Sequence, residues 1–159
     1  MDHLSFMSEA LTLAAQAARE GEVPVGCVIV RNGQIVGRGR NRRETGKSAL
    51  AHAEIEAIGD ACRNLGGWRL WDCTLYVTLE PCPMCAGAII NARIPRVVFG
   101  AKDPKCGACG SVCDLFSMAF NHHPEVTSDV EADACGALLQ DFFSSLRQRK
   151  KETSAQKSL

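Results

Sequence analysis

Two short motifs constrain the fold of this chain more than any other feature. One is His52-Ala53-Glu54, and the other is Pro81-Cys82-Pro83-Met84-Cys85. Together they supply one imidazole, two thiols and one carboxylate, the groups of a zinc site with three protein ligands and an open fourth position. Cysteines three positions apart share one face of a helix and can bind the same ion. We therefore expect His52, Cys82 and Cys85 to bind zinc, and Glu54 to remain for proton transfer.

The spacing also places these residues within the fold. His52 and Glu54 are two positions apart, so on a helix their side chains point to different sides. They can converge only around the end of the helix, and because side chains lean toward the N-terminus, the first turn is where this works. The sequence thus predicts two helices that both begin at the metal. Their positive dipole ends favour thiolate over thiol and stabilise negative charge in the pocket.

Neither motif alone identifies a catalytic centre. A His-x-Glu pair occurs by chance in helices, and a lone Cys-x-x-Cys can be a redox pair or a structural zinc site. A zinc-binding module outside the enzyme class could use the same three residues, but it would need a fourth protein ligand to close the site. The occurrence of both motifs in this order, each at an expected helix start, favours a catalytic centre.

Length and composition indicate one globular domain. The chain has 159 residues, of which 46% are hydrophobic and 23% charged, enough to form a substantial core. We expect a single zinc-dependent domain over residues 1–149, and a flexible tail over 150–159 because that segment has almost nothing to bury. The longest apolar run, Val23 to Val30, is far shorter than the roughly 18 residues of a membrane span. Since the start of the chain also lacks a signal-peptide pattern, we expect a cytoplasmic protein without a membrane partner.

Seven of the nine cysteines lie outside the metal motif. In a chain of this size without a secretory signal, we expect cysteines to stay reduced. Cys106, Cys109 and Cys113 suggest a second metal site, but no fourth ligand lies nearby in the sequence. We therefore expect them to be buried as small hydrophobic residues and assign them no metal. The other four, with no assigned role, are Cys27, Cys62, Cys73 and Cys135.

The net charge is zero, so the overall charge does not indicate a nucleic-acid-binding protein. The basic residues nevertheless gather in three stretches. These are Arg38, Arg40, Arg42, Arg43 and Lys47; then Lys102 and Lys105; and then Arg147, Arg149, Lys150 and Lys151. A single run of this kind is usually a solvated face, and RNA backbone contact is the alternative.

The periodicity of apolar residues and the turn signals predict helices alternating with strands after an initial hairpin. Helices are expected at 4–20, from 52 to 65, from 83 and from 128, with a short one near 114–119, and strands at 23–30, 35–39, 73–79, 96–101 and 125–127. This order predicts an α/β fold, a three-layer α/β/α sandwich around a five-stranded mixed sheet. The active site is expected at one edge of strand ends, where the two metal-binding helices begin.

Two finer expectations concern the helices. In the helix that follows His52, we expect the inner face to consist of Ile55, Ile58, Cys62 and Leu65. The stretch Ser128-Asp129-Val130-Glu131 has the pattern of a capping box that opens the last helix. The apolar face of that helix is expected to be Val130, Ala134, Leu138, Phe142 and Leu146.

These motifs resemble the cytidine deaminase-like superfamily and, within it, the bacterial tRNA-specific adenosine deaminases, which convert the wobble adenosine to inosine. The most specific pieces are Glu22-Val23-Pro24-Val25-Gly26, Ala51-His52-Ala53-Glu54, Thr74 through Cys82, Met84-Cys85-Ala86-Gly87-Ala88, Val97-Val98-Phe99-Gly100-Ala101 and Asp141-Phe142-Phe143. The similarity runs from about Phe6 to Arg149. The zinc motif indicates the superfamily, whereas the strand after it and the C-terminal helix point to the tRNA enzymes.

The resemblance implies a role for each matched residue. It makes His52, Cys82 and Cys85 the ligands of one zinc ion per chain, and Glu54 the proton shuttle. Four further positions match substrate-contacting residues of the family. Asn41 matches an asparagine that hydrogen-bonds the target base, Asp103 an aspartate close to the substrate backbone, and Asn121 and His122 a pair on the RNA-facing side. Family members are typically homodimers in which the partner subunit helps to line the pocket.

The expected reaction is the hydrolytic deamination of adenosine to inosine in a tRNA anticodon loop, with release of ammonia. Zinc would activate a water molecule, and Glu54, which is not a ligand, would transfer protons to ring N1 and to the departing amine. An anticodon stem-loop suits such a site because its bases are already unpaired. The alternative within the class is a deaminase of a free nucleobase or nucleoside, of the guanine or cytosine type, with the same zinc chemistry.

Overall fold

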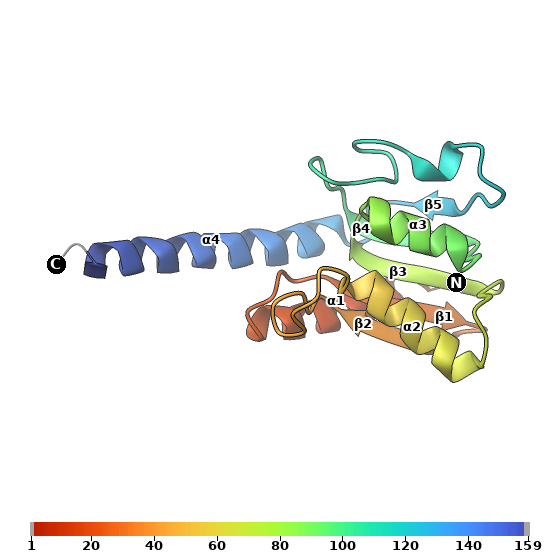
Figure 1. The fold of residues 1–159 in the computed structure, drawn as a ribbon, viewed down its shortest axis with the longest axis horizontal. Helices are drawn as coiled ribbons and strands as arrows, with labels where there is room; N and C mark the ends of the chain where they lie inside the picture. Colours follow the sequence, from red (N-terminus) through yellow and green to blue (C-terminus); the bar gives the residue numbers. More distant parts are fainter. Residues whose placement is uncertain (1, 158–159) are drawn as a thin grey trace.

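In a computed structural model that describes residues 2–157, a five-stranded mixed sheet lies between two layers of helices (Figure 1). The elements are α1 (His3–Arg19), β1 (Gly26–Arg31), β2 (Gln34–Arg40), α2 (Ala53–Leu65), β3 (Cys73–Leu79), α3 (Pro83–Asn91), β4 (Arg96–Ala101), the short 3-10 helix η1 (Leu115–Ser117), β5 (Glu125–Thr127) and α4 (Ala132–Lys157). The strand order in the sheet is β2-β1-β3-β4-β5. The predicted three-layer fold is therefore confirmed.

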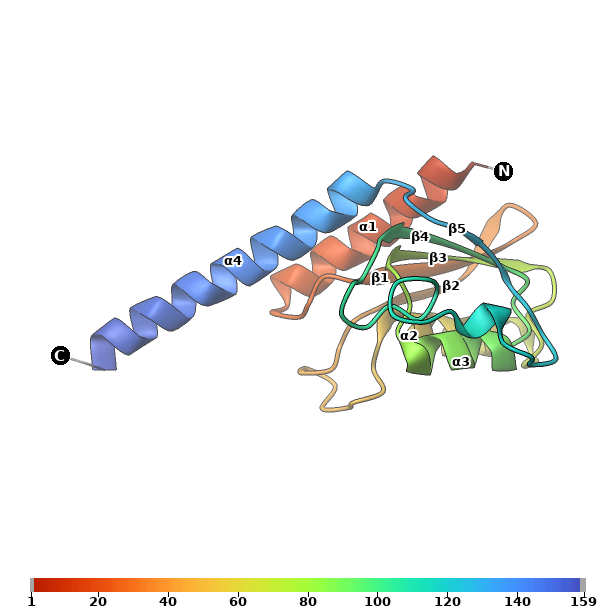
Figure 2. The ribbon, with the colours of Figure 1, turned by 90° about the horizontal axis from the view of Figure 1, so that it is seen from above.

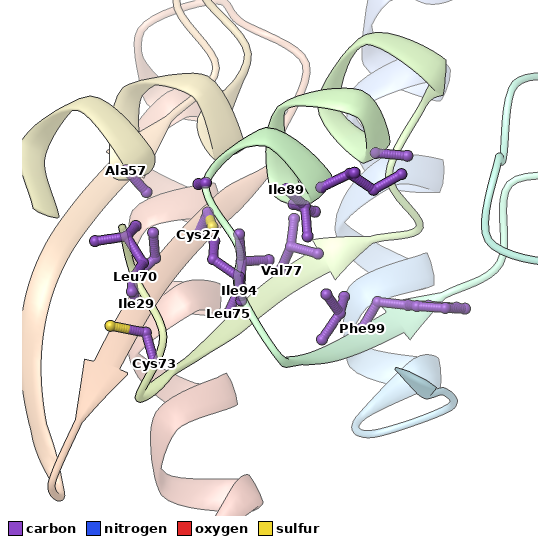
Figure 3. Packing of buried hydrophobic residues seen from close by; sticks show 14 of the residues in the cluster. Cys27, Ile29, Ala57, Leu70, Cys73, Leu75, Val77, Ile89, Ile94 and Phe99 are labelled. Carbon is purple, nitrogen blue, oxygen red and sulfur yellow. The ribbon is translucent and has the colours of Figure 1, made fainter. Parts of the chain in front are cut away.

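The sheet is buried on both faces. Figure 2 shows α1 and the start of α4 on one side and α2 and α3 on the other. Side chains alternate across β3, so Leu75 and Val77 join the core beneath α2 and α3 (Figure 3), whereas Tyr76 packs with α1 residues such as Met7. Strands covered on both faces explain the nearly continuous apolar sequence of β3.

Helix α2 approaches the sheet closely because β2 carries glycines. A Cβ added at Gly37 would overlap the carbonyl of Ala57, and one at Gly39 would overlap that of Ala53. The buried face of α2 therefore consists of small residues and one acid, namely Ala53, Glu54, Ala57 and Ala61. The predicted inner face was right in part: Ile58, Cys62 and Leu65 are partly buried and pack against the core, whereas Ile55 does not, and the fully buried positions were not predicted.

The sheet topology brings two loops to one edge. Strands β3 and β4 are parallel, with Leu79 paired to Ala101, so their carboxyl ends lie side by side. The chain continues from β3 into the Pro81-Cys82 turn and from β4 into the loop 102–111. This is the edge where ligands bind in open α/β sheets.

The start of α4 differs from the prediction. Asp129 and Glu131 have φ angles of 64° and 57°, so the chain turns out of helical geometry there, and the helix begins only at Ala132. The Ser128 hydroxyl donates to the Asp129 carboxylate instead of capping the helix. The capping box was therefore wrong, and so was the expected burial of Ala134, which is exposed; Cys135 is buried instead.

Beyond its first turns α4 projects away from the rest of the molecule (Figures 1 and 2). The helix has 26 residues, and every side chain from Arg147 to Lys157 is exposed. The flexibility expected for residues 150–159 stays a prediction, and Ser158 and Leu159 lie outside the described residues. Within residues 2–157, no helix is long and apolar enough to cross a membrane.

Candidate active site

The starts of α2 and α3 bring three metal-ligating side chains together. His52 is the N-cap of α2, Cys82 is the N-cap of α3, and Cys85 lies in the first turn of α3. Pro83 follows Cys82 at the first helical position, where its missing N–H costs nothing. The ligand atoms of the three residues all lie within 4.8 Å of one another, so this group could hold a metal ion.

The separations fit zinc in particular. His52 Nδ1 lies 3.5 Å from Cys82 Sγ and 3.4 Å from Cys85 Sγ. Tetrahedral zinc, with Zn–N and Zn–S bonds of about 2.0 and 2.3 Å, would separate such ligand atoms by about 3.5 Å. One imidazole and two thiols are also the donors that this borderline-soft ion prefers.

The two cysteines differ in how they titrate. The pKa of Cys82 is lowered from 9.0 to about 4, because the Cys85 thiol donates a hydrogen bond to its sulfur and His52 adds a second. The same contact raises the pKa of Cys85, and the hydrogen bond to Cys82 raises the pKa of His52. The site therefore offers a thiolate at the N-terminus of a helix, where its charge is stabilised.

Glu54 lies beside these ligands in the first turn of α2. Its side chain is 4% exposed. Burial raises the pKa of Glu54 from 4.5 to about 7, and its carboxyl group also forms a hydrogen bond with Cys85. A carboxyl group that titrates near neutrality can both accept and return a proton at physiological pH.

A pocket of about 470 Å³ opens over this group. Its lining residues come from the metal-binding turns, from the segments before β1 and after β2, from the loop after β4 and from α4. They are Val23, Val25, Asn41, Arg43, His52, Ala53, Glu54, Leu79, Glu80, Cys82, Lys102, Asp103, Pro104, Lys105, Cys106, Leu139 and Phe143. Of the eight predicted site residues, the structure brings five to this pocket, and Cys85 lies directly beside it through its contact with His52.

Asn41 is buried at the wall of the pocket. Its side-chain amide donates to the Val23 carbonyl at 3.2 Å, and its oxygen accepts from the Arg43 amide at 3.2 Å. An asparagine amide has a second N–H and its oxygen a second lone pair, so each end keeps capacity for one more partner. Asn41 is thus held in place by the backbone with hydrogen-bonding groups left for a ligand.

Asp103 also lines the pocket, but part of its side chain has a structural role. Its Oδ1 accepts hydrogen bonds from the amides of Lys105 and Cys106, at 3.0 and 3.2 Å. Asp103 therefore caps the loop that follows β4. Contact with a substrate backbone stays a prediction for this residue.

Asn121 and His122 do not line this pocket. Asn121 is exposed, and His122 Nε2 lies 2.7 Å from the carbonyl oxygen of Ile94. They follow η1 and the exposed side chain of Phe120, close in sequence to a second, apolar hollow on the face of α3. Any role for this pair in contacting RNA stays a prediction.

Two of the surplus cysteines differ from expectation. Cys109 is buried, but Cys106 and Cys113 are exposed, so their interpretation as buried hydrophobic residues was wrong. Cys106 also lines the pocket. In the part of the chain that the structure describes, the only group of three or more potential ligands that meets metal-site geometry is His52, Cys82 and Cys85.

Sequence reasoning missed several residues of the pocket wall. Leu139 and Phe143 of α4 reach the pocket, four positions apart on one helix face. The expected apolar face of α4 lies one position away from this stripe. The helix begins later than predicted, packs on the sheet through Cys135, and reaches the pocket with the turns that follow. Glu80 was not predicted as a site residue, although its position between an apolar strand and the metal-binding turn was a signal that it is buried.

Known proteins are similar to this chain over nearly its full length. The family model described as MafB19-like deaminase matches residues 1–147. The tRNA-specific adenosine deaminase of Bacillus subtilis strain 168 is 50% identical over 155 residues, covering 97% of this chain and 95% of that protein. The chain belongs to the tRNA-specific adenosine deaminase family.

Solved structures show how this deaminase family compares with its relatives. A structure from a study of A-to-I editing by tRNA:A34 deaminases at the wobble position is 45% identical, with a TM-score of 0.82, covering 85% of this chain and 99% of that one. The guanine deaminase of Bacillus subtilis is 36% identical, with a TM-score of 0.63, covering 80% and 84%. The deaminase fold is thus shared with base-specific enzymes, whereas the tRNA enzymes are more similar in both sequence and structure.

Proposed function

We propose that this deaminase hydrolyses the wobble adenosine of a tRNA anticodon loop to inosine, with release of ammonia. The observation that carries the proposal is the 50% identity, over nearly the full length of both chains, to a tRNA-specific adenosine deaminase. The His52, Cys82 and Cys85 group beside the buried Glu54 provides the site for that reaction. Because the substrate is a tRNA, we expect the enzyme to act in the cytoplasm.

We further propose that His52, Cys82 and Cys85 hold one zinc ion per chain. The separations between His52 Nδ1 and the two sulfur atoms support this, as does the thiolate character of Cys82. When bound, zinc acts as a Lewis acid that lowers the pKa of a water molecule to about 7. Removing the metal with a chelator should abolish turnover, and adding zinc back should restore it.

Glu54 is the proposed proton carrier. Hydrolysis adds water across the C6=N1 bond of adenine, with oxygen bonding to C6 and one proton reaching ring N1. A second proton must reach the exocyclic nitrogen as its bond to C6 breaks and ammonia leaves. Glu54 can accept the proton of the attacking water and return it, because its carboxyl group titrates near neutrality and is not needed to hold the metal. The reaction is balanced as adenosine plus water giving inosine plus ammonia.

The pocket walls suit an unpaired nucleotide. A base stacked in a duplex cannot enter a recess of about 470 Å³, whereas an anticodon base can leave its loop without breaking a base pair. Asn41 retains hydrogen-bonding groups for the base. Arg43, Lys102 and Lys105 supply positive charge around the pocket, where neighbouring phosphates would lie.

We also propose that the enzyme is a homodimer. The face of α3 has an apolar hollow of about 490 Å³ whose lining includes Leu50, Met84 and Phe120. Leu50 and Phe120 are 61% and 47% exposed in the single chain, and a second copy would cover them. Such a dimer would also bring Asn121 and His122 to an interface, which accords with a role for them at the partner's pocket. Light scattering should give the mass of two chains, and a mass of one chain would contradict the proposal.

The similarity to guanine deaminase makes a free-base enzyme the competing candidate. The zinc-loaded protein should be incubated with an adenosine-containing anticodon stem-loop and, separately, with free guanine, adenine and cytosine. We expect ammonia from the stem-loop at a rate far above that from any free base. Rapid release from guanine without release from the stem-loop would favour the competing activity.

A further inference from the structure

We propose that two buried glutamates, Glu22 and Glu80, are positioning residues that hold the opposite walls of the substrate pocket and thereby set its affinity for RNA. This inference rests on the proposed function and extends it to two residues whose carboxylates bind backbone amides of the pocket loops. Glu22 is 1% exposed and Glu80 is 2% exposed. A carboxylate is rarely buried this fully unless its charge is compensated.

Glu80 holds the wall that follows β4. Its carboxylate accepts hydrogen bonds from the amides of Asp103, Cys109 and Ser111, at 3.1, 3.0 and 3.1 Å, and from the Ser111 hydroxyl. The segment spanned by these contacts includes the pocket-lining residues from Asp103 to Cys106. One side chain therefore gathers both ends of a loop that has little regular structure of its own.

The loop also fits tightly around Glu80. A Cβ added at Gly107 would overlap the Glu80 carboxylate, so only glycine allows this approach. The Ala108 amide donates to the Pro81 carbonyl at 2.8 Å, which ties the same loop to the turn that carries Cys82. This hydrogen bond fixes the position of the wall relative to the turn that carries Cys82.

Glu22 holds the pocket wall that follows β2. Its two oxygens accept from the amides of Glu44 and Thr45, at 3.1 and 2.7 Å. This fixes the loop that begins with Asn41 and includes Arg43, both of which line the pocket. The two walls are consequently fastened by the same device, a buried carboxylate that binds backbone amides.

The partners of these carboxylates are what mark them as loop anchors. Among the described residues, neither Glu22 nor Glu80 forms a salt bridge with a lysine or arginine within 4.0 Å. Charge-assisted hydrogen bonds from backbone N–H groups are strong and directional, so they compensate burial only while the loop keeps its shape. Among the described residues Arg43 and Lys105 form no salt bridge and remain available to phosphates, whereas Lys102 lies 3.7 Å from the carboxylate of Asp129.

The test replaces each anchor by its neutral isostere, Glu22→Gln and Glu80→Gln, in the zinc-loaded enzyme. A glutamine has one acceptor oxygen and presents an amino group to N–H donors, so the loop amides lose partners. We expect KM for the stem-loop to rise at least about tenfold in each variant. Because Glu54 and the ligands are untouched, kcat and zinc content should change by less than about threefold.

Hydrogen exchange provides a second readout that does not depend on turnover. The amides of Cys109 and Ser111 should exchange faster in Glu80→Gln, and those of Glu44 and Thr45 in Glu22→Gln. Matched controls are Glu20→Gln, whose carboxylate pairs with the Arg40 side chain, and Glu125→Gln on the exposed face of β5. Neither control should change KM or the protection of these loops.

If Glu80→Gln does not fold, Gly107→Ala displaces the same loop while keeping the carboxylate, and it should raise KM in the same way. Unchanged exchange at the loop amides, or faster exchange with an unchanged KM, would overturn the inference. A fall in kcat with KM unchanged would also overturn it. Absence of turnover by the unmodified enzyme on the stem-loop would instead overturn the proposed function, and the two failures are therefore distinguishable.

Discussion

Replacing Glu54 by glutamine should stop turnover without removing the metal. The substitution keeps the size and shape of the side chain, which is 4% exposed, so no cavity is created. It removes only the ability to accept and return a proton. Since His52, Cys82 and Cys85 are the proposed metal ligands, we expect the variant to bind zinc as tightly as the unmodified enzyme.

The size of the effect follows from the carboxylates around the pocket. Besides Glu54, the acidic residues that line it are Glu80 and Asp103. Glu80 is committed to the loop amides, and Asp103 caps the loop after β4. No second carboxyl group is therefore placed to take over, and the full contribution of general acid–base catalysis, about 10² to 10⁴ in kcat, should be lost. This corresponds to about 3 to 5 kcal/mol of transition-state stabilisation.

The assay is steady-state release of ammonia from an anticodon stem-loop, with zinc measured on the same samples. Glu56→Gln is a suitable control, because Glu56 lies on the same helix but does not line the pocket. We expect KM of Glu54→Gln to stay within about threefold of normal. Loss of zinc would show that Glu54 holds the metal, and a kcat within about tenfold of normal would show that another group carries the proton.

Asp103→Asn keeps an oxygen that can cap the loop, so a loss of activity reports on substrate contact. We expect the transition-state stabilisation for an RNA stem-loop to fall by about 1.5 to 3 kcal/mol and that for a deoxy stem-loop to change little. Equal losses on the two substrates would leave Asp103 a purely structural role. Replacing the four basic residues within 147–151 by alanine should reduce the slope of log affinity against log salt by about 3, and an unchanged slope would mean that this part of α4 is only a solvated face. Metal analysis should find about one zinc per chain, lost in Cys82→Ser and retained in Cys106→Ser; a second zinc lost in the latter would contradict the single site. Burial raises the pKa of Glu22, but hydrogen bonds from the loop amides outweigh it and leave that pKa below 4.5. Its stabilising effect is thus present above pH 4.5 and lost as pH falls, and urea unfolding should show Glu22→Gln less stable at pH 7, with the gap closing in acid; a constant gap would refute this.

The group of potential metal ligands could be predicted from sequence in part because its geometry is partly local. Cys82 and Cys85 are three positions apart at a helix start, so their spacing indicated that they share a site. The pairing of His52 with them rested on the occurrence of both motifs and on the resemblance to a known family. Layer order and strand identity were also predictable from periodicity. What the sequence did not show is how the two helix starts come together, and the parallel pairing of β3 and β4 determines where the second of them lies.

The errors arose where distant parts of the chain determine local structure. The inner face of α2 was assigned to large apolar residues, but Gly37 and Gly39 let the helix approach so closely that alanines face the sheet. The capping box before α4 failed because Asp129 and Glu131 adopt positive φ angles as the chain turns from β5 into the helix. At such positions tertiary packing overrides the local helix propensity of the sequence.

The roles of Glu22 and Glu80 were likewise hidden from sequence. Their partners are backbone amides that lie more than twenty positions away, and every residue except proline has such an amide. The sequence therefore gives no indication of which backbone amide donates the hydrogen bond to a buried carboxylate. A charged residue within an apolar segment indicates only that some compensation exists, and the structure identifies the loop that provides it.

The most direct measurement is the nucleoside content of a full-length tRNA with adenosine at the wobble position after incubation with the zinc-loaded enzyme. Digestion and mass spectrometry should find about one inosine per tRNA, located at the wobble position. The same tRNA with guanosine at that position should yield no inosine. Inosine spread over other adenosines, or none at the wobble position while free guanine is deaminated, would contradict the proposal that this enzyme is a wobble-specific tRNA adenosine deaminase.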